Sequence, residues 1–329
     1  MSRVVRFHRT GGPEVLQIDD VEVAQPGPGE VRLTVKALGL NRSEIMFLQG
    51  AYLDTPRLPA RVGYEASGVV ESVGEGVTEV SAGDVVSTIP SFSQNDYGVC
   101  AEMAVVPARS VAKFPPSFSW AEGAAIWMQY MTASGALIQI AQMNAGDVVL
   151  IPAASSSVGL AAIQLANMVG AKPIALTRNA GKKERLLALG AAHVVVTEEE
   201  DLVSAVMKIT DGTGARLVFD PVGGPYVMNL AGATARGGII FQYGGLSKEP
   251  TPFPAWEVVS KSLTIRGYGL FEIVMDPAKF AAAKQFISNG LETGNLKPVI
   301  DRKFPFDEIV EAYRYLESNQ QVGKVVVTL

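Results

Sequence analysis

The segment from residue 147 to residue 291 alternates short apolar runs with helix-like segments, and this alternation constrains the fold more than any other feature. Apolar runs of the buried-strand type occur at 147–152, 173–177, 193–196, 216–220, 238–243 and 262–267. Segments with helical spacing of apolar side chains follow them at 158–169, 182–189, 202–209, 225–235 and 278–291. Short strands alternating with helices are typical of a parallel sheet with helices on both faces. The sequence therefore predicts an α/β domain with a doubly wound sheet, preceded by an Ala-rich helical segment at 121–139.

The first hundred residues and the tail have a different, β-rich character. Strand-like runs at 15–18, 31–35 and 68–73 are separated by turns rich in Gly and Pro, which predicts a compact, irregular antiparallel barrel. The tail holds a short amphipathic helix around Tyr313 and ends in a strand at 324–329, so we expect it to fold back onto the first domain. The predicted domains are 1–121 together with 295–329, and 122–294.

Composition excludes several classes of protein. Lys and Arg number 28 and Asp and Glu number 33, which gives a net charge of −5 and argues against binding to nucleic acid or anionic membranes. The only cysteine is Cys100, so neither an internal disulfide framework nor a Cys-rich zinc site is expected. No stretch approaches the roughly 20 apolar residues of a membrane span, and the N-terminus lacks a continuous apolar leader. We expect a cytoplasmic protein.

A strand runs directly into a small-residue turn and a helix at 147–159, where the sequence is DVVLIPAASSSVG. This is the phosphate-binding context of dinucleotide folds, because small residues let the main chain approach a pyrophosphate and a helix N-terminus offers free N–H groups. The three positions of the usual Gly-x-Gly-x-x-Gly pattern hold Ala154, Ser156 and Gly159. The residues expected to contact a dinucleotide are Ser155, Ser156, Ser157 and Val158. A serine-rich helix cap without a ligand is the alternative.

The end of the next strand indicates which dinucleotide is bound. Thr177 and Arg178 end this strand, and Lys182 follows one helical turn later, while no Asp or Glu occurs at 175–183. An acidic residue here would bind a ribose 2′-hydroxyl, whereas an Arg suits a 2′-phosphate. Thr177, Arg178 and Lys182 therefore favour NADP over NAD, with a solvated basic helix start as the alternative.

Several motifs occur in an order that resembles a known family. They are GLNRSE at 39–44, GYEASGVV at 63–70, GDVV at 83–86, AASSSVG at 153–159, FDPVGG at 219–224 and GKVVV at 323–327. Together they resemble the medium-chain dehydrogenase/reductase superfamily, in its zinc-free, quinone-oxidoreductase-like branch, over essentially the whole chain. The resemblance implies a GroES-like catalytic domain interrupted by a Rossmann domain, with the active site in the cleft between them.

The resemblance also implies roles for single residues. Tyr52 matches a tyrosine near the nicotinamide whose hydroxyl can donate to the substrate carbonyl, and a tyrosine in a surface loop is the alternative. Asn41 matches a cofactor-facing position that can donate or accept, and Tyr64 is expected to line the pocket. The further cofactor contacts implied are Thr132, Tyr243, Gly244, Leu270, Phe271 and Lys324, the last of them reaching the phosphates. A plain helix threonine and a solvated strand-edge charge are the alternatives for Thr132 and Lys324.

The same comparison predicts that no catalytic zinc is bound. Zinc-dependent relatives have Cys where this chain has Asn41 and His where it has Tyr64, and their third ligand position falls at Met128. Catalytic zinc needs three protein ligands drawn from His, Cys or carboxylate. Asn, Tyr and Met do not supply them.

Without a metal, alcohol oxidation lacks its Lewis acid, and neither His8 nor His193 is placed to relay a proton. We therefore expect hydride transfer from NADPH to the electrophilic carbon of a quinone, enone or enal, whose oxygen takes up the charge. A zinc-free alcohol or aldehyde reductase and a non-catalytic NADPH-binding protein of crystallin type are the alternatives. The family further implies a homodimer, for which the edge strand at 262–267 offers a pairing surface.

Overall fold

The computed structural model describes residues 1–329 and divides them into two compact units. The first unit consists of Met1–Met128 and Lys297–Leu329, and the second consists of Gln129–Leu296. The second unit is thus inserted into the chain of the first. The sequence predicts the two boundaries at 121 and 295, whereas the first boundary of the structure lies inside the helix Trp127–Ser134.

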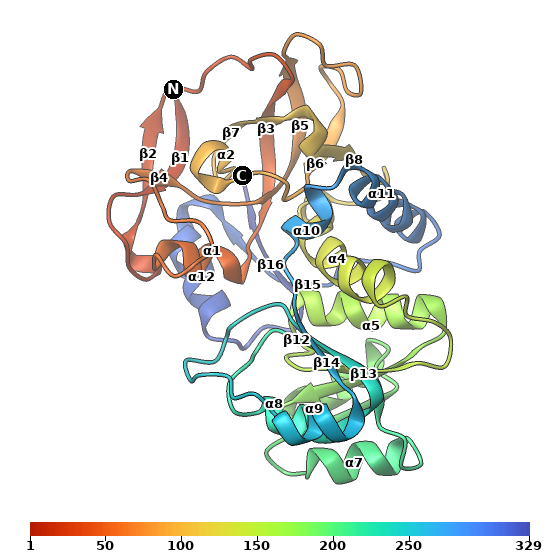
Figure 1. Ribbon diagram of the computed structural model, residues 1–329. Helices are drawn as coiled ribbons and strands as arrows, with labels where there is room; N and C mark the ends of the chain where they lie inside the picture. The colour runs from red at the N-terminus through yellow and green to blue at the C-terminus, as the bar shows by residue number, and fades with distance from the viewer. The chain divides into compact units, whose positions relative to one another are not determined.

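The first unit consists mainly of β-strands, with a few short helices (Figure 1). Its strands are β1 (Ser2–Phe7), β2 (Leu16–Val21), β3 (Glu30–Gly39), β4 (Ala60–Arg61), β5 (Glu65–Val73), β6 (Val85–Thr88), β7 (Met103–Pro107), β8 (Val111–Lys113), β15 (Ile300–Pro305) and β16 (Lys324–Thr328). Its helices are α1 (Arg42–Leu48), α2 (Gln94–Tyr97), α3 (Trp120–Gly123) and α12 (Ile309–Glu317).

These strands form two sheets. The larger sheet has the order β15-β16-β3-β5-β6-β8, with β7 also paired to β3, and the smaller has the order β2-β1-β4. All the pairs are antiparallel except β15 with β16. Because β16 lies between β15 and β3, the last strand of the chain completes a sheet that begins near the N-terminus, as the sequence predicts.

Small residues let α3 approach the larger sheet closely. A Cβ atom at Gly39 of β3 would lie 1.8 Å from the carbonyl oxygen of Ala124, so no side chain fits there. Ala37, Ala121 and Val326 fill the rest of this contact and are buried. The close approach fixes the end of β3, from which the candidate site residue Asn41 follows.

The second unit alternates strands and helices (Figure 1). Its strands are β9 (Val148–Ile151), β10 (Lys172–Thr177), β11 (His193–Val196), β12 (Ala215–Asp220), β13 (Thr234–Gln242) and β14 (Thr264–Gly267). Its helices are α4 (Trp127–Ser134, which begins in the first unit), α5 (Ser157–Val169), α6 (Lys183–Ala188), α7 (Leu202–Ile209), α8 (Val227–Ala233), α9 (Ala255–Lys261), α10 (Phe271–Val274) and α11 (Pro277–Glu292).

The six strands form one parallel sheet in the order β11-β10-β9-β12-β13-β14. The strands β10 and β11 therefore lie on one side of β9, and β12, β13 and β14 lie on the other. With right-handed crossovers, α5 and α8 then lie on opposite faces of the sheet. This is the doubly wound order of dinucleotide-binding folds, whose ligands bind at the carboxyl ends of the strands where the order reverses. The sheet confirms the predicted Rossmann architecture. Buried Leu150, Ile174 and Val218 form part of its core.

Two parts of this unit differ from the prediction. The segment expected as one helix at 121–139 is divided into α3, α4 and a π-helical turn at Gly135–Ile140. A Cβ at Gly135 would lie 2.2 Å from the Tyr268 hydroxyl, so this turn packs directly against the side chain of Tyr268. Helix α9 was not predicted, because its sequence AWEVVSK exposes Trp256 and Val259 instead of burying an apolar stripe. None of the helices combines the length and the apolar character that a membrane span requires.

Candidate functional site

The main chain of the turn between β9 and α5 is held by a helix cap and by close packing. The Ser156 hydroxyl accepts a hydrogen bond from the main-chain N–H of Gly159 at 3.1 Å and caps α5. A Cβ at Gly159 would lie 2.7 Å from both Cα and O of Ala154, so the helix packs against the turn without any side chain between them. Ala153 has φ of 49°, a left-handed conformation that costs an L-residue about 1 kcal/mol. The main chain of the turn is therefore tightly determined.

Lys182, which follows β10 in the chain, contacts this turn. Its Nζ donates to the Ser155 hydroxyl at 3.0 Å. Arg178, at the end of β10, is exposed. The structure thus brings Lys182 into contact with Ser155, whereas the side chain of Arg178 is exposed to solvent. A turn with free N–H groups, a helix N-terminus and an ammonium group suits a phosphate-bearing ligand.

Tyr243 and Gly244 follow β13 at the carboxyl edge of the sheet. The ring of Tyr243 stacks on Phe219 at 3.9 Å between centroids, and its hydroxyl is buried without a hydrogen-bond partner. Burial raises the pKa of this phenol well above its ordinary value. A Cβ at Gly244 would lie 2.6 Å from the carbonyl oxygen of Pro221, so the main chain here passes close to the end of β12. Because the hydroxyl of Tyr243 is buried, only the main chain or the ring of this residue can make the predicted contact with a cofactor.

The other predicted residues of the second unit occupy two helices. Thr132 lies in α4 and is buried, and Leu270 and Phe271 begin α10 with partly exposed side chains. Their predicted contacts with a nicotinamide ring stay predictions.

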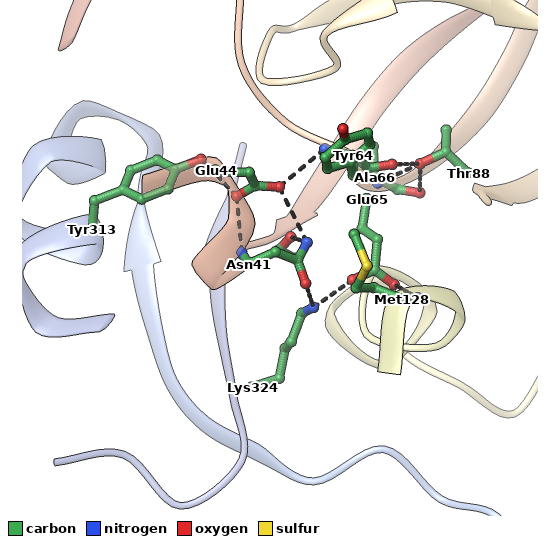
Figure 2. Close-up of polar contacts among 10 residues, drawn as sticks. Asn41, Glu44, Tyr64, Glu65, Ala66, Thr88, Met128, Tyr313 and Lys324 are labelled. Carbon is green, nitrogen blue, oxygen red and sulfur yellow. Dashed lines mark hydrogen bonds and ion pairs between the residues drawn. The ribbon is translucent and has the colours of Figure 1, made fainter. Parts of the chain in front are cut away.

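In the first unit, Glu44 is the centre of a buried polar network, which Figure 2 shows. Its carboxylate accepts four hydrogen bonds: from the main-chain N–H of Asn41 at 2.8 Å, the Asn41 amide at 3.1 Å, the main-chain N–H of Tyr64 at 3.0 Å and the Tyr313 hydroxyl at 2.8 Å. Burial raises the pKa of Glu44, and these donors oppose the rise. Because all four partners donate, the geometry is that of an ionised carboxylate.

A second buried carboxylate, Glu65, pairs with Lys324. The Lys324 ammonium forms a short ion pair with Glu65 and donates to Oδ1 of Asn41 at 2.6 Å, while the other oxygen of Glu65 accepts from the main-chain N–H of Met128 at 2.8 Å. Both side chains of the pair are 1% exposed. Glu65 thus has a structural role. For Lys324, the alternative of a solvated strand-edge charge is wrong, because the ammonium lies inside the unit and has two partners, while its predicted contact with the cofactor phosphates stays a prediction.

These contacts define what Asn41 can do. Its Nδ2 group donates both hydrogens, to the carbonyl of Gly39 at 3.0 Å and to Glu44, and its Oδ1 accepts from Lys324. Only Oδ1 has capacity left for a further partner. The sequence leaves open whether Asn41 donates or accepts, and this arrangement leaves acceptance alone.

Tyr52 and Tyr64 lie beside each other near Ser43. Each phenol affects the pKa of the other, and burial is the main cause that raises the pKa of both. Tyr52 is partly exposed, whereas Tyr64 is 2% exposed and stacks at a tilt against Phe92, with ring centroids 5.9 Å apart. Two protonated phenols are therefore available as hydrogen-bond donors, and Tyr52 is the one with access to solvent.

The positions that hold zinc ligands in zinc-dependent relatives do not fit a metal in this chain. Asn41 is a neutral amide whose Oδ1 already accepts from the Lys324 ammonium, Tyr64 is a protonated phenol and Met128 contributes a main-chain N–H to Glu65. No group of three or more His, Cys, Asp or Glu side chains in the structure could hold a metal ion. His8 contacts Asp19 at 3.0 Å, and His193 begins β11. Cys100 is buried, and burial raises the pKa of its thiol, as for a cysteine that packs in the core.

Sequence reasoning missed Glu44 as the centre of the network. The signal that could have found it is the three-residue spacing from Asn41 to Glu44, which is typical of a helix N-terminal capping box. Its contact with Tyr313 spans 269 positions and has no local signal. Trp127 is a core residue whose Nε1 donates to the Ser87 hydroxyl at 2.8 Å.

Comparison with known proteins agrees with this architecture. A family model described as zinc-binding dehydrogenase matches residues 157–289, and one described as alcohol dehydrogenase GroES-like domain matches residues 27–116. Quinone oxidoreductase of Lama guanicoe is 32% identical over 333 residues, which cover 100% of this chain and 98% of that protein.

Solved structures are similar over the full length of the chain. The Escherichia coli quinone oxidoreductase complexed with NADPH has a TM-score of 0.92 and 29% identity, with 100% of both chains covered. A structure described as NAD-dependent alcohol dehydrogenase has a TM-score of 0.91 and 33% identity, also with 100% of both chains covered.

A β-rich, GroES-like unit interrupted by a Rossmann unit with a phosphate-binding turn defines the class of two-domain nucleotide-dependent dehydrogenases and reductases. The chain belongs to the medium-chain dehydrogenase/reductase superfamily, in its quinone-oxidoreductase-like branch.

Proposed function

We propose that this protein is an NADPH-dependent oxidoreductase that reduces quinones or conjugated carbonyl compounds without a catalytic metal. The observation that carries the proposal is the contact of Lys182 with Ser155, which joins a positive charge to the glycine-poor turn at the start of α5. Ser155 belongs to the predicted pyrophosphate turn and Lys182 to the predicted 2′-phosphate site. Their contact therefore links two features that the sequence predicts separately. The relative from Escherichia coli, whose structure contains NADPH, supports the same cofactor.

The choice of NADPH over NADH rests on charge at the end of β10. Arg178 is exposed there, and Lys182 follows it on the next turn of chain. An acidic side chain that would repel a 2′-phosphate is missing from 175–183. Arg binds phosphate oxygens in bidentate fashion, and Lys adds a point charge.

The proposed chemistry asks little of the protein beyond positioned donors. NADPH supplies a hydride when it is bound. A conjugated carbonyl that accepts hydride at its β carbon, or a quinone, moves the electron pair onto oxygen, and the hydroxyl of Tyr52 would donate a hydrogen bond to that oxygen. Tyr64 would stand beside the Tyr52 phenol as a second protonated donor. Solvent or a phenol can then supply the proton. Asn41, which can only accept, would receive a hydrogen bond from a hydroxyl of cofactor or substrate.

Steady-state assays of NADPH oxidation test the proposal. Purified protein at fixed concentration is supplied with a quinone, an enone, an enal and a simple ketone, with and without a chelator. We expect turnover of the conjugated acceptors, little turnover of the ketone, and no effect of the chelator. Tight NADPH binding without turnover of any acceptor would refute the enzymatic proposal and favour a non-catalytic NADPH-binding protein.

A zinc-free alcohol or aldehyde reductase is the second candidate. The structure described as an NAD-dependent alcohol dehydrogenase, at 33% identity over the full chain, favours it. The same assay separates the two candidates, because an alcohol or aldehyde reductase would turn over the simple carbonyl at least as fast as the enone. Comparison of NADH with NADPH provides a second criterion.

We further propose a cytoplasmic homodimer. Strand β14 is an edge of the parallel sheet, and the segment before it exposes three large apolar side chains, Phe253, Trp256 and Val259. An unpaired edge beside apolar surface is a pairing site for a second copy. Light scattering after gel filtration should give twice the chain mass, and a Trp256→Glu variant should shift it toward the monomer.

A further inference from the structure

The loop at 52–59, between α1 and β4, is held almost entirely by side chains of one other segment. None of the main-chain hydrogen bonds of turns, loops and caps involves these residues. Its polar contacts, apart from those of Tyr52 itself, come from residues 93–96 at the start of α2. The loop carries Tyr52 at its first position, so whatever holds the loop also holds that phenol.

Asn95 provides the central contact. Its Oδ1 accepts from the main-chain N–H of Arg57 at 2.7 Å, and its Nδ2 donates to the carbonyl of Thr55 at 2.9 Å. The side-chain amide thus pairs with the loop as a neighbouring strand would, with one donor and one acceptor. These two hydrogen bonds attach the main chain of the loop to α2.

The residues beside Asn95 extend this attachment. The Ser93 hydroxyl donates to Asp54, and Asp96 forms an ion pair with Arg57. The Gln94 side chain is 1% exposed and turns inward, where its Oε1 accepts from the main-chain N–H of Gly63 at 2.8 Å beside Tyr64. Residues 93–96 therefore contact both the loop of Tyr52 and the main chain just before Tyr64.

We propose that the 93–96 segment is a clamp that positions Tyr52 against Tyr64, and that Asn95 is its principal positioning residue. This inference rests on the proposed function for the role of Tyr52, while the clamp itself rests on the contacts alone. Asn95 touches neither phenol, so it acts through the loop. Loss of its amide would let the Tyr52 hydroxyl leave the place where it can meet developing charge.

The first test is independent of activity. Arg57 offers a trypsin site within the exposed loop, and cleavage there requires the loop to leave the clamp. In Asn95→Ala we expect cleavage after Arg57, followed by mass spectrometry, to be roughly tenfold faster or more, because two hydrogen bonds are lost. Asn144→Ala is the matched control, since it removes an exposed asparagine that bonds to the main chain of a turn in the second unit. Cleavage as slow in Asn95→Ala as in wild type would overturn the clamp.

The second test asks whether Asn95 acts through Tyr52. We expect Asn95→Ala to lower enone turnover about 10-fold or more, the usual consequence of a displaced reacting group, with NADPH affinity unchanged. Combined with Tyr52→Phe, it should cause no further loss, because the hydroxyl that it positions is already gone. Asn95→Asp keeps the acceptor for Arg57 and should lie between Asn95→Ala and wild type. Losses that multiply in the double variant would overturn the positioning role.

The two proposals fail in different ways. A wild-type protein without turnover of any acceptor would refute the proposed function, while accelerated cleavage in Asn95→Ala would still establish the clamp. Accelerated cleavage together with full enone turnover in Asn95→Ala would refute the positioning of Tyr52.

Discussion

At the scale of single residues, the proposed preference for NADPH can be tested at the exposed guanidinium of Arg178. Changing Arg178 to Ala should weaken NADPH binding by about 1.5–3 kcal/mol, the range of a charge-assisted hydrogen bond, and leave NADH almost unaffected. Fluorescence titration with both cofactors measures this. Lys172→Ala, at the opposite end of the same strand and also exposed, is the control. Equal losses for NADPH and NADH would show that Arg178 supports the fold rather than a 2′-phosphate.

The Tyr52 hydroxyl is the second single group with a defined expectation. Tyr52→Phe keeps the ring, so packing and NADPH affinity should survive. Loss of a donor aimed at developing charge typically costs about 100- to 1,000-fold in turnover at a dry, preorganised site. We expect that loss with enones and a smaller one with quinones, since a reduced quinone carries its charge well and takes its proton from water. Undiminished enone turnover would shift the donor role to Tyr64 or to solvent.

At the scale of secondary-structure elements, the Lys324–Glu65 pair connects β16 to β5 and, through the N–H of Met128, to α4. Lys324→Met leaves a buried carboxylate without its cation and should cost about 3–5 kcal/mol of unfolding free energy. Urea denaturation measures the loss, and the double variant Lys324→Met/Glu65→Gln should recover part of it. A loss within the ~0.5 kcal/mol of an ordinary surface change would contradict this account.

The same variant tests the phosphate contact that the family resemblance implies for Lys324. If the ammonium also binds a cofactor phosphate, NADPH affinity of the folded variant falls together with stability. Unchanged affinity assigns Lys324 to the ion pair alone.

The junction of β9 with α5 depends on a missing side chain. Gly159→Ala would place a methyl group 2.7 Å from the main chain of Ala154 and force the turn to shift. We expect a loss of about 1–3 kcal/mol in stability, as for other overpacked sites, with weaker binding of both cofactors. Gly267→Ala, where no atom lies within 4 Å of the added methyl group, is the control for thermal denaturation. Equal melting temperatures for the two variants would refute close packing at the turn.

Elements with strong local patterns could be predicted from the sequence, and contacts between distant segments could not. Strand β11 and helix α7 have the predicted bounds, because a short apolar run and an amphipathic segment can each be recognised from the local sequence. The resemblance brought attention to Asn41, Tyr52 and Tyr64, but not to Glu44 or Asn95, which join them.

The reason is that polar networks carry no periodicity. Asn95 meets Thr55 across 40 positions, and Lys324 meets Asn41 across 283. Such pairs become visible only when the fold brings them together. The inward turn of Lys324 follows from the buried Glu65 opposite it, a partner that the sequence around residue 324 does not indicate.

At the scale of the whole molecule, the proposed chemistry should proceed without metal. Elemental analysis of the purified protein should find far less than one zinc per chain, and prolonged dialysis against a chelator should leave NADPH oxidation and the melting temperature unchanged. The reason is that Asn41, Tyr64 and Met128 are engaged in hydrogen bonds or buried packing and supply no anionic or imidazole ligand. Stoichiometric zinc that is removed together with activity would refute metal independence.

The central position of the last strand has a consequence for how the protein is made. Strand β16 separates β3 from β15, so the sheet of the first unit stays open until residues 324–328 have been synthesised. The second unit, whose strands are continuous in sequence, can fold while synthesis proceeds. During that interval β3 presents an unpaired edge on the side that β16 will occupy, which is a template for pairing between nascent chains. Synthesis of β16, rather than folding of the dinucleotide domain, then closes this edge of the sheet.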